Sequence, residues 1–141
     1  GVQQYKGEVW MEAFDEFYAL CKHPIIYNGD VTSIKDIQNL EEKYPKLAGV
    51  MIGRGLLTRP SLASEYVTGV ELSWEKRSPV LLDFHNRLKA HYETTANSEA
   101  QVHSRLRLFW EYMEEELGKK VYKKIMKAGN LKNYLNAVRE I

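Results

Sequence analysis

One short pattern occurs twice in the sequence and limits how the chain can fold: an apolar run that ends in a glycine turn. It reads IIYNGD at Ile25–Asp30 and VMIGRG at Val50–Gly55. Between the two runs, Ser33 and Asp36 have the spacing of a capping box, which predicts that a helix begins after Ser33. Two apolar strands separated by about 20 residues with a helix among them are typical of a parallel βαβ crossover. Because two strands alone do not form a stable sheet, we expect further strands or another chain to complete it.

Helical patterns flank this βαβ unit. Apolar residues at helical spacing predict a helix over Val9–Leu20 before the first strand. A second, short helix is predicted over Leu56–Tyr66, with Pro60 in its first turn. In eight-stranded α/β barrels, a phosphate site formed by two such turns with a short extra helix nearby follows strands 7 and 8.

The two glycine turns also predict where the chain binds a ligand. Glycine lets a backbone approach phosphate oxygens closely and adopt unusual dihedrals, and the N–H groups of such turns form an anion site. Because the two strands are predicted to be neighbours, both turns converge on one dianion, to which the Arg54 guanidinium adds a forked contact. The predicted phosphate site consists of Asn28, Gly29, Asp30, Gly53 and Arg54, and the Asp30 side chain is expected to cap the following turn. The alternative is that both glycines serve only tight turns.

After about residue 76 the strand patterns end and helical patterns follow. Short loops between helical segments are typical of an antiparallel helical bundle. The sequence therefore predicts an α/β domain over 1–68 and an all-helical domain over 69–141, joined by a linker at 67–77. Four segments have an apolar face at helical spacing: one that opens at Ser78-Pro79, one that opens at Ser98 with Gln101 and extends to Leu117, one over Lys119–Ala128 with Gly129 as its C-cap, and one capped by Asn130.

The net charge of +1 hides a difference between the two halves of the chain. Residues 1–75 have seven basic and 11 acidic side chains, whereas residues 76–141 have 13 basic and eight acidic. An excess of basic residues in one module indicates an anionic partner, and a plain solvated surface is the alternative. The basic residues expected to face that partner are Arg105, Arg107, Lys119, Lys120, Lys123, Lys124 and Lys127.

Other sequence features exclude several classes of protein. The single cysteine, Cys21, cannot form an internal disulfide, which indicates a reducing, cytoplasmic setting, and we expect it to be an ordinary half-buried thiol. The four histidines do not have metal-ligand spacing, so no metal is predicted. No run of 18 apolar residues is present, so no segment is expected to span a membrane.

The residues around the two turns resemble a known family. The stretches YKG at 5–7, HPIIYNGDVTS at 23–33 and GVMIGRGLLTRPSL at 49–62 resemble the carboxyl-terminal part of the tRNA-dihydrouridine synthases. In that family NGD follows barrel strand 7 and GR follows strand 8, and together they hold the phosphate of FMN. The resemblance therefore implies the last two βα units of a TIM (β/α)8 barrel, followed by a helical domain that binds tRNA. The basic residues named above would then contact tRNA phosphates without reading sequence.

The resemblance also implies an activity. FMN reduced by NADPH would transfer hydride to uracil C6 while a cysteine acid protonates C5, which gives 5,6-dihydrouridine in tRNA after the target base leaves its stack. The family's catalytic cysteine, its lysine near the flavin and its His/Arg pair belong to segments before residue 1, so no catalytic residue is expected in this chain.

Expectations for the chain by itself follow from the missing segments. We expect it to be inactive, to bind FMN weakly or not at all, and to self-associate through unpaired sheet edges. Two alternatives to the synthase remain open. One is a non-catalytic nucleic-acid-binding helical module on an α/β remnant, and the other is a different barrel enzyme that binds a phosphorylated sugar.

Overall fold

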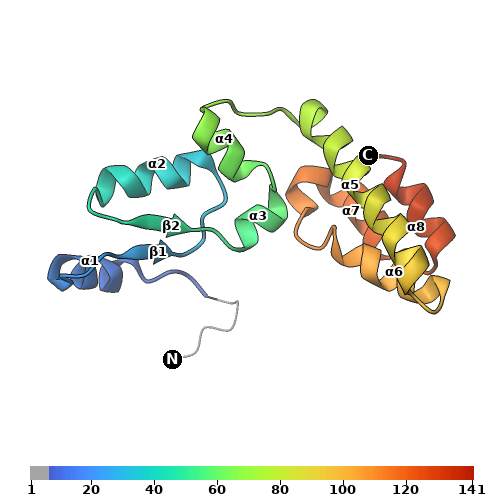
Figure 1. Cartoon of the computed structure of the whole chain (residues 1–141), viewed down its shortest axis with the longest axis horizontal. Coiled ribbons are helices and arrows are strands. Elements are labelled where there is room, and N and C mark those ends of the chain that lie inside the picture. The colour runs from blue at the N-terminus through green and yellow to red at the C-terminus, as the bar shows by residue number, and fades with distance from the viewer. Residues whose placement is uncertain (1–6) are drawn as a thin grey trace. The chain divides into compact units, whose positions relative to one another are not determined.

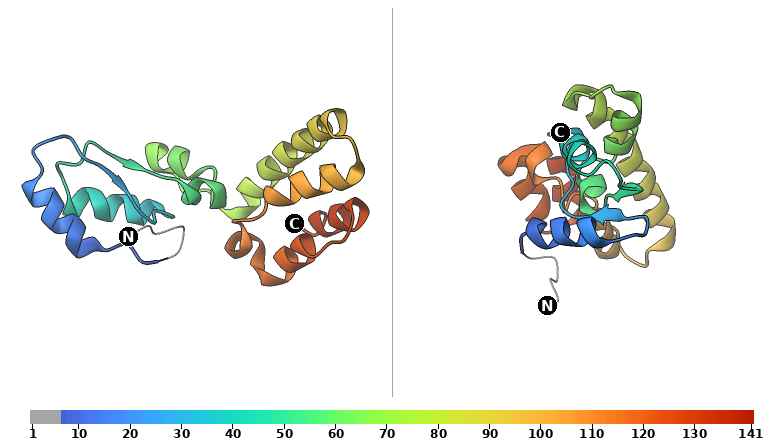
Figure 2. Two further views of the ribbon diagram at one scale, coloured as in Figure 1. Left: turned by 90° about the horizontal axis from the view of Figure 1, so that it is seen from below. Right: turned by 90° about the vertical axis from the view of Figure 1, so that its left-hand side faces the viewer.

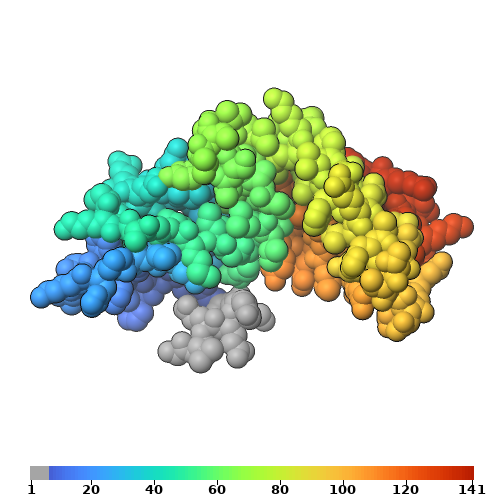
Figure 3. All heavy atoms as spheres, viewed as in Figure 1, coloured from blue at the N-terminus to red at the C-terminus, as the bar shows by residue number. Residues whose placement is uncertain are grey.

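The computed structural model describes residues 7–141, in which the chain forms two compact units, one that ends at Leu56 and one over Leu57–Ile141 (Figure 1; all atoms in Figure 3). Tyr5 and Lys6, part of the YKG motif, lie outside the described residues. The predicted domains 1–68 and 69–141 stay a prediction, and by packing residues 57–68 belong with the helices that follow them. Within residues 7–141 no helix is long and apolar enough to cross a membrane.

The first unit contains the predicted parallel βαβ crossover. Its two strands form a parallel pair in which Tyr27 lies opposite Val50, and a helix connects them. Because both strands run in the same direction, their carboxyl ends lie at the same edge of the sheet. In chain order the elements are α1 (Met11–Leu20), β1 (Ile26–Asn28), α2 (Ile34–Lys43) and β2 (Gly49–Met51).

The start of α2 is fixed by the predicted capping box. The Asp36 N–H donates to the Ser33 hydroxyl at 3.1 Å, and the Ser33 N–H donates to the Asp36 carboxylate at 2.9 Å. These bonds satisfy N–H groups that have no partner within the helix. The capping box is confirmed.

The core of the first unit lies between the sheet and α2. Its buried apolar residues are Tyr27, Val31, Ile37, Leu40 and Tyr44. Helix α1 adds partly buried rings but has no buried residue, and large apolar side chains on α1 and on both strands remain exposed. The exposed set includes Trp10, Phe17, Leu20, Ile26 and Met51.

The predicted helix over Leu56–Tyr66 is wrong, because the structure has two helices there. Helix α3 (Arg54–Thr58) begins directly after Gly53, and α4 (Leu62–Thr68) begins after Pro60. Proline lacks an N–H group and disfavours helical geometry at the residue before it, so the chain leaves the helix between Thr58 and Leu62.

The second unit buries a continuous apolar core, and it has a helix for each of the four predicted helical segments, although three of them have other bounds (Figure 2). Helix α6 packs on both α5 and α8, and α8 also packs on α7. The largest fully buried apolar side chains of this core are Leu106, Trp110, Met113, Ile125 and Tyr134. The helices are α5 (Trp74–Thr95), α6 (Glu99–Leu108), α7 (Glu114–Met126) and α8 (Leu131–Val138).

Helix α5 begins at Trp74, ahead of the predicted start at Ser78-Pro79, and therefore has Pro79 inside it. The proline removes one helical hydrogen bond. Arg77, one turn into the helix, is 8% exposed and bonds to Leu72 and Glu116, so tertiary contacts hold this first turn.

Helices α6 and α7 also differ from the prediction. Helix α6 ends at Leu108 and does not extend to Leu117, and α7 begins at Glu114 and passes through a kink at Gly118, where φ is 73°. Gly129 is not a left-handed C-cap, because α7 ends at Met126 with Lys127 as its C-cap and Gly129 has no positive φ. The last cap is confirmed, since Asn133 N–H donates to the Asn130 side chain at 2.8 Å.

Candidate functional site

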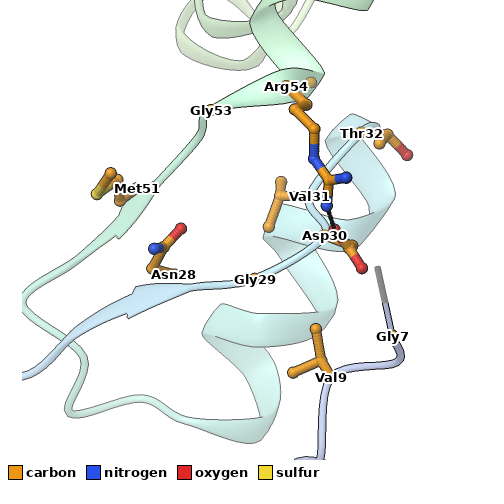
Figure 4. Close-up of a pocket in the computed structure, with 11 residues that line it drawn as sticks. Gly7, Val9, Asn28, Gly29, Asp30, Val31, Thr32, Met51, Gly53 and Arg54 are labelled. Carbon is orange, nitrogen blue, oxygen red and sulfur yellow. Dashed lines mark hydrogen bonds and ion pairs between the residues drawn. The ribbon is translucent and has the colours of Figure 1, made fainter. Parts of the chain in front are cut away.

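A hollow of about 690 Å³ lies at the carboxyl ends of β1 and β2, where the two glycine turns meet (Figure 4). All five residues of the predicted phosphate site line it, although they come from turns about 25 residues apart in the sequence. Val31, Thr32, Met51 and Gly55 line the hollow as well, with Gly7 and Val9 from the chain before α1. The parallel pairing of the strands is what brings the two turns together.

Arg54 and Asp30 form an ion pair across this hollow. The Arg54 guanidinium donates to the Asp30 carboxylate at 2.6 Å, and both side chains are about half exposed (Figure 4). The Asp30 side chain therefore does not cap the following turn as predicted. That cap is made by Ser33 and Asp36, and the Thr32 N–H also donates to Asp36 at 3.0 Å.

Gly29, Gly53 and Gly55, the glycines of the two turns, have two different roles. A Cβ at Gly53 would meet no atom within 4 Å, so the packing of the protein does not require glycine there. A Cβ at Gly29 would overlap the Tyr27 ring, and a Cβ at Gly55 would overlap the Val31 carbonyl oxygen. Gly29 and Gly55 are therefore needed for packing, and Gly53 is the one of these three glycines that leaves open space in the hollow.

The expectation of unusual dihedrals at these turns is wrong. Gly29, Gly53 and Gly55 all lack a positive φ, which among the described residues occurs at Gly7, Gly69 and Gly118. The first turn is closed by the Val31 N–H, which donates to the Gly29 carbonyl at 2.7 Å. The sequence did not single out Gly55, because its neighbour Val31 is 24 positions away and only the fold brings them into contact.

The basic residues of the second unit are in three different environments. Lys119, Lys120, Lys123 and Lys127 are exposed, whereas Lys124 forms an ion pair with Glu140 at 2.7 Å. The Arg105 guanidinium lies over the Tyr92 ring at 5.6 Å. Arg107 is half-buried and donates to the Met126 carbonyl at 3.4 Å, so it connects α6 to the end of α7.

A buried group of ions that sequence patterns did not indicate fixes the start of the helical unit. Glu65 is 1% exposed and accepts hydrogen bonds from Arg59 and Ser61. The Leu72 carbonyl accepts from Arg59 at 3.2 Å and from Arg77 at 3.0 Å. Two arginines therefore bind one carbonyl in the connection between α4 and α5.

Both arginines of this group also have carboxylate partners. Arg59 pairs with Glu65, and Arg77 pairs with Glu116 of α7 at 2.7 Å. Burial raises the pKa of the Glu65 carboxyl, but the hydrogen bonds from Arg59 and Ser61 outweigh it, and the net pKa is lowered. Each buried charge is thus paired, as stability requires.

Cys21 lies at the end of α1, before the amino end of β1, and is half-buried. The hollow lies at the carboxyl ends of the strands, so the thiol is at the other end of β1. In the described part of the chain, no group of three or more His, Cys, Asp or Glu side chains could hold a metal ion.

A parallel βαβ unit with a hollow at the carboxyl ends of its strands is an α/β unit of the kind that binds ligands at that edge, here followed by a helical unit. The chain belongs to the dihydrouridine synthase (Dus) family, whose sequence model matches residues 3–140.

Two curated relatives are both tRNA-dihydrouridine(16) synthases. The protein from Aquipseudomonas alcaligenes is 32% identical over 89 residues, and the protein from Pseudomonas syringae pv. tomato is 28% identical over 92 residues. Each match covers 59% of this chain and 28% of the relative. The chain therefore covers little more than a quarter of the length of these relatives.

Proposed function

We propose that this chain is the carboxyl-terminal part of a tRNA-dihydrouridine synthase that reduces uridine to 5,6-dihydrouridine in tRNA with FMN and NADPH. In this proposal the first unit supplies the last two βα units of a TIM barrel, and the second unit binds tRNA. Membership of the family, which is FMN-dependent and acts on tRNA, supports the proposal. The observation that carries it is the hollow in which both family turns meet.

The residues of the hollow fit the phosphate of FMN. Gly53 faces open space that no protein atom fills, so the missing side chain leaves room for a ligand. Arg54 supplies a cation at the same edge, and among the described residues that line the hollow Asp30 is the only carboxylate. Asn28, Gly29, Asp30, Gly53 and Arg54 would hold the phosphate, with the backbone next to Gly53 in closest contact.

Bound FMN would supply the hydride chemistry of the synthase. The residues of this chain would bind and orient it. Asp30 keeps the Arg54 guanidinium directed across the hollow, and a phosphate would share the guanidinium with that carboxylate. No residue of the chain is assigned a proton transfer, because Asp30 is the one carboxylic acid among the residues 7–141 that line the hollow, and Cys21 lies at the other end of β1.

The phosphate site is tested by FMN content in the intact synthase that includes this chain. We expect Gly53→Val to release FMN, because its side chain would fill the open space, and Arg54→Ala to weaken FMN binding by about 1.5–3 kcal/mol, the range for a charged hydrogen bond. The measurement is flavin absorbance of the purified protein. Gly49→Val is the matched control, since Gly49 also has no atom within 4 Å of a Cβ but lies at the amino end of β2. Full retention of FMN by both Gly53→Val and Arg54→Ala would refute the site.

The tRNA surface in this proposal consists chiefly of the exposed lysines of α7 and its end, Lys119, Lys120, Lys123 and Lys127, with Lys124 and Arg105 beside them. Arg107 belongs to the proposed tRNA surface too, and it also connects α6 to the end of α7 through its bond to the Met126 carbonyl. Charge reversal at Lys120 and Lys123 should weaken binding of an unmodified tRNA transcript and reduce the slope of affinity against salt concentration. Lys76→Glu on α5 is the control for a change of charge. An unchanged salt slope would make these lysines a plain solvated surface.

A further inference from the structure

The second unit has a groove between α5 and α8 that the proposed function leaves unused. Its volume is about 540 Å³, within the range of about 300–1,000 Å³ typical of small-molecule pockets. One face of α5 contributes Leu82, His85, Asn86 and Lys89, which follow each other at helical spacing, and α8 contributes Leu135 and Val138. The groove is therefore lined by both apolar and polar side chains.

His85 is fully buried, and one of its ring nitrogens has no hydrogen-bond partner. The Tyr134 hydroxyl accepts from Trp110 Nε1 at 2.9 Å and donates to the Leu106 carbonyl at 3.1 Å. Its proton is thus used, so His85 Nε2, at 2.7 Å, has to donate to the same hydroxyl. His85 is then the neutral tautomer with its proton on Nε2, and Nδ1 is a buried acceptor without a donor.

His85 is itself one of the residues that line the groove. Its Nε2 is directed at Tyr134 in the core, so Nδ1 is the ring nitrogen that is left for a ligand in the groove. Asn86 lines the groove, and a buried acceptor without a donor costs free energy that a ligand could recover.

The rim of the groove is basic. Lys89 from α5 and Arg139 at the end of α8 both line it, and none of the described residues that line it is acidic. Lys89 also contacts Glu93 at 2.6 Å on the surface, and Arg139 contacts the Asn136 side chain at 3.4 Å, so each cation keeps donors for a ligand. An anionic group is therefore favoured beside Lys89 and Arg139. It is disfavoured beside His85 Nδ1, because two acceptors repel each other.

We propose that this groove binds one unstacked nucleotide of an RNA chain. The base lies against Leu82, Leu135 and Val138, a base N–H or amino group donates to His85 Nδ1, and the phosphate contacts Lys89 and Arg139. A free phosphate would leave the apolar walls and the acceptor unused, whereas a nucleotide satisfies both. The proposal rests on the proposed function only in taking tRNA as the RNA.

The first test fills the groove and measures binding of an unmodified tRNA transcript to the purified chain by fluorescence anisotropy. Ala90 is exposed and lines the groove, so Ala90→Phe should weaken tRNA binding at least about fivefold, the lower range for loss of one base contact. Ala100→Phe is the matched control, since Ala100 is an exposed alanine on α6 outside the groove. Arg139→Gln should also weaken binding, with Lys132→Gln on α8 as its control.

The second test needs no variant and follows the imidazole nitrogens of His85 by NMR. Addition of uridine monophosphate or of a short single-stranded RNA should shift the Nδ1 resonance, and addition of inorganic phosphate should not. A role in core packing alone would leave Nδ1 unchanged in every case. Because the NMR measurement uses the unaltered chain, it still tests the groove if Ala90→Phe fails to fold.

The outcomes separate this proposal from the proposed function. Weaker tRNA binding after reversal of Lys120 and Lys123, with Ala90→Phe and the Nδ1 signal unaffected, would overturn the groove and leave the tRNA surface intact. A Nδ1 shift with the mononucleotide, from a chain that binds no tRNA, would overturn both the tRNA surface and RNA as the occupant. Loss of tRNA affinity in Ala90→Phe together with the Nδ1 shift supports the groove.

Discussion

The two units of this chain bury apolar surface to very different degrees. In the helical unit the core is continuous, and Leu106, Trp110 and Ile125 are fully buried. In the βα unit the core is limited to one side of a two-stranded sheet, and α1 buries no residue. Leu20 is 80% exposed and Ile26 is 64% exposed.

This difference shows that the two units obtain their stability in different ways. Burial of apolar area is the main favourable contribution to folding, and the helical unit achieves it with its own four helices. Among the described residues the sheet has only two strands, with unpaired edges and uncovered apolar side chains, so we expect the βα unit to need a neighbour that covers them. The two candidate binding surfaces are divided in the same way. The hollow lies in the βα unit, and the exposed lysines lie in the helical unit.

The largest expected effect comes from separating the units. A chain of residues 57–141 should fold alone and unfold cooperatively, whereas residues 1–56 alone should lack a cooperative transition. The whole chain should self-associate through the uncovered βα unit, and residues 57–141 should sediment as a monomer. Circular dichroism during thermal unfolding and sedimentation velocity measure these properties. A cooperative, monomeric 1–56 fragment would contradict the comparison.

Removal of the same methyl groups from each unit should have unequal effects. Leu106 is 0% exposed, so Leu106→Ala should lower the free energy of unfolding by about 2–5 kcal/mol. Leu20 is 80% exposed, so Leu20→Ala should change it by about 0.5 kcal/mol or less. Urea unfolding of the full chain gives both values. An equally large loss for Leu20→Ala would mean that a second copy already covers α1.

Two glycines of one motif should respond differently to alanine. Gly55→Ala should destabilise the βα unit by more than about 1 kcal/mol, because the Cβ overlaps the Val31 carbonyl and the backbone has to move. Gly53→Ala should stay within about 0.5 kcal/mol, since its Cβ meets open space. Hydrogen exchange of the α2 and β1 amides reports on this unit directly. Equal protection in the two variants would show that the contact between the turns is loose.

The smallest effect is a dependence on pH that only the helical unit should show in mildly acidic solution. Burial lowers the pKa of His85 below its ordinary 6.5, so the unfolded chain binds the proton more readily than the folded one. The stability from neutral His85 is therefore present above about pH 6.5 and decreases as the pH falls below it. Thermal unfolding of residues 57–141 between about pH 8 and about pH 5 measures the loss.

A variant isolates the contribution of this histidine. His85→Gln keeps a donor for Tyr134 but cannot take up a proton, so it should reduce the dependence on pH. An undiminished dependence on pH would assign that dependence to other groups, such as His103, whose pKa is also lowered by burial.

The stability of the βα unit should decrease only at lower pH. Burial raises the pKa of Asp36, but hydrogen bonds from Thr32 and Ser33 outweigh it and hold the net value below the ordinary 3.8.

Local signals in the sequence were enough to predict much of the fold. The capping box of Ser33 and Asp36 and the cap at Asn130 involve residues three apart, and helical and strand spacing are read over a single turn or run. The meeting of the two glycine turns at one edge of the sheet was also predicted, because parallel strands place their carboxyl ends together whatever their side chains. These features depend on neighbours in sequence or on the topology alone.

Other features were decided only by the tertiary structure, because they join residues that are far apart in the sequence. The Arg54–Asp30 pair spans 24 positions, and the His85–Tyr134 bond spans 49. Gly29 and Gly53 have the same sequence context of a glycine after an apolar strand, yet only Gly29 has the Tyr27 ring against it. Pro79 remains within α5 because Arg77 is bonded to Leu72 and to Glu116, 39 positions away. Sequence determines which local conformations are favoured, and packing between distant residues determines which of them the chain keeps.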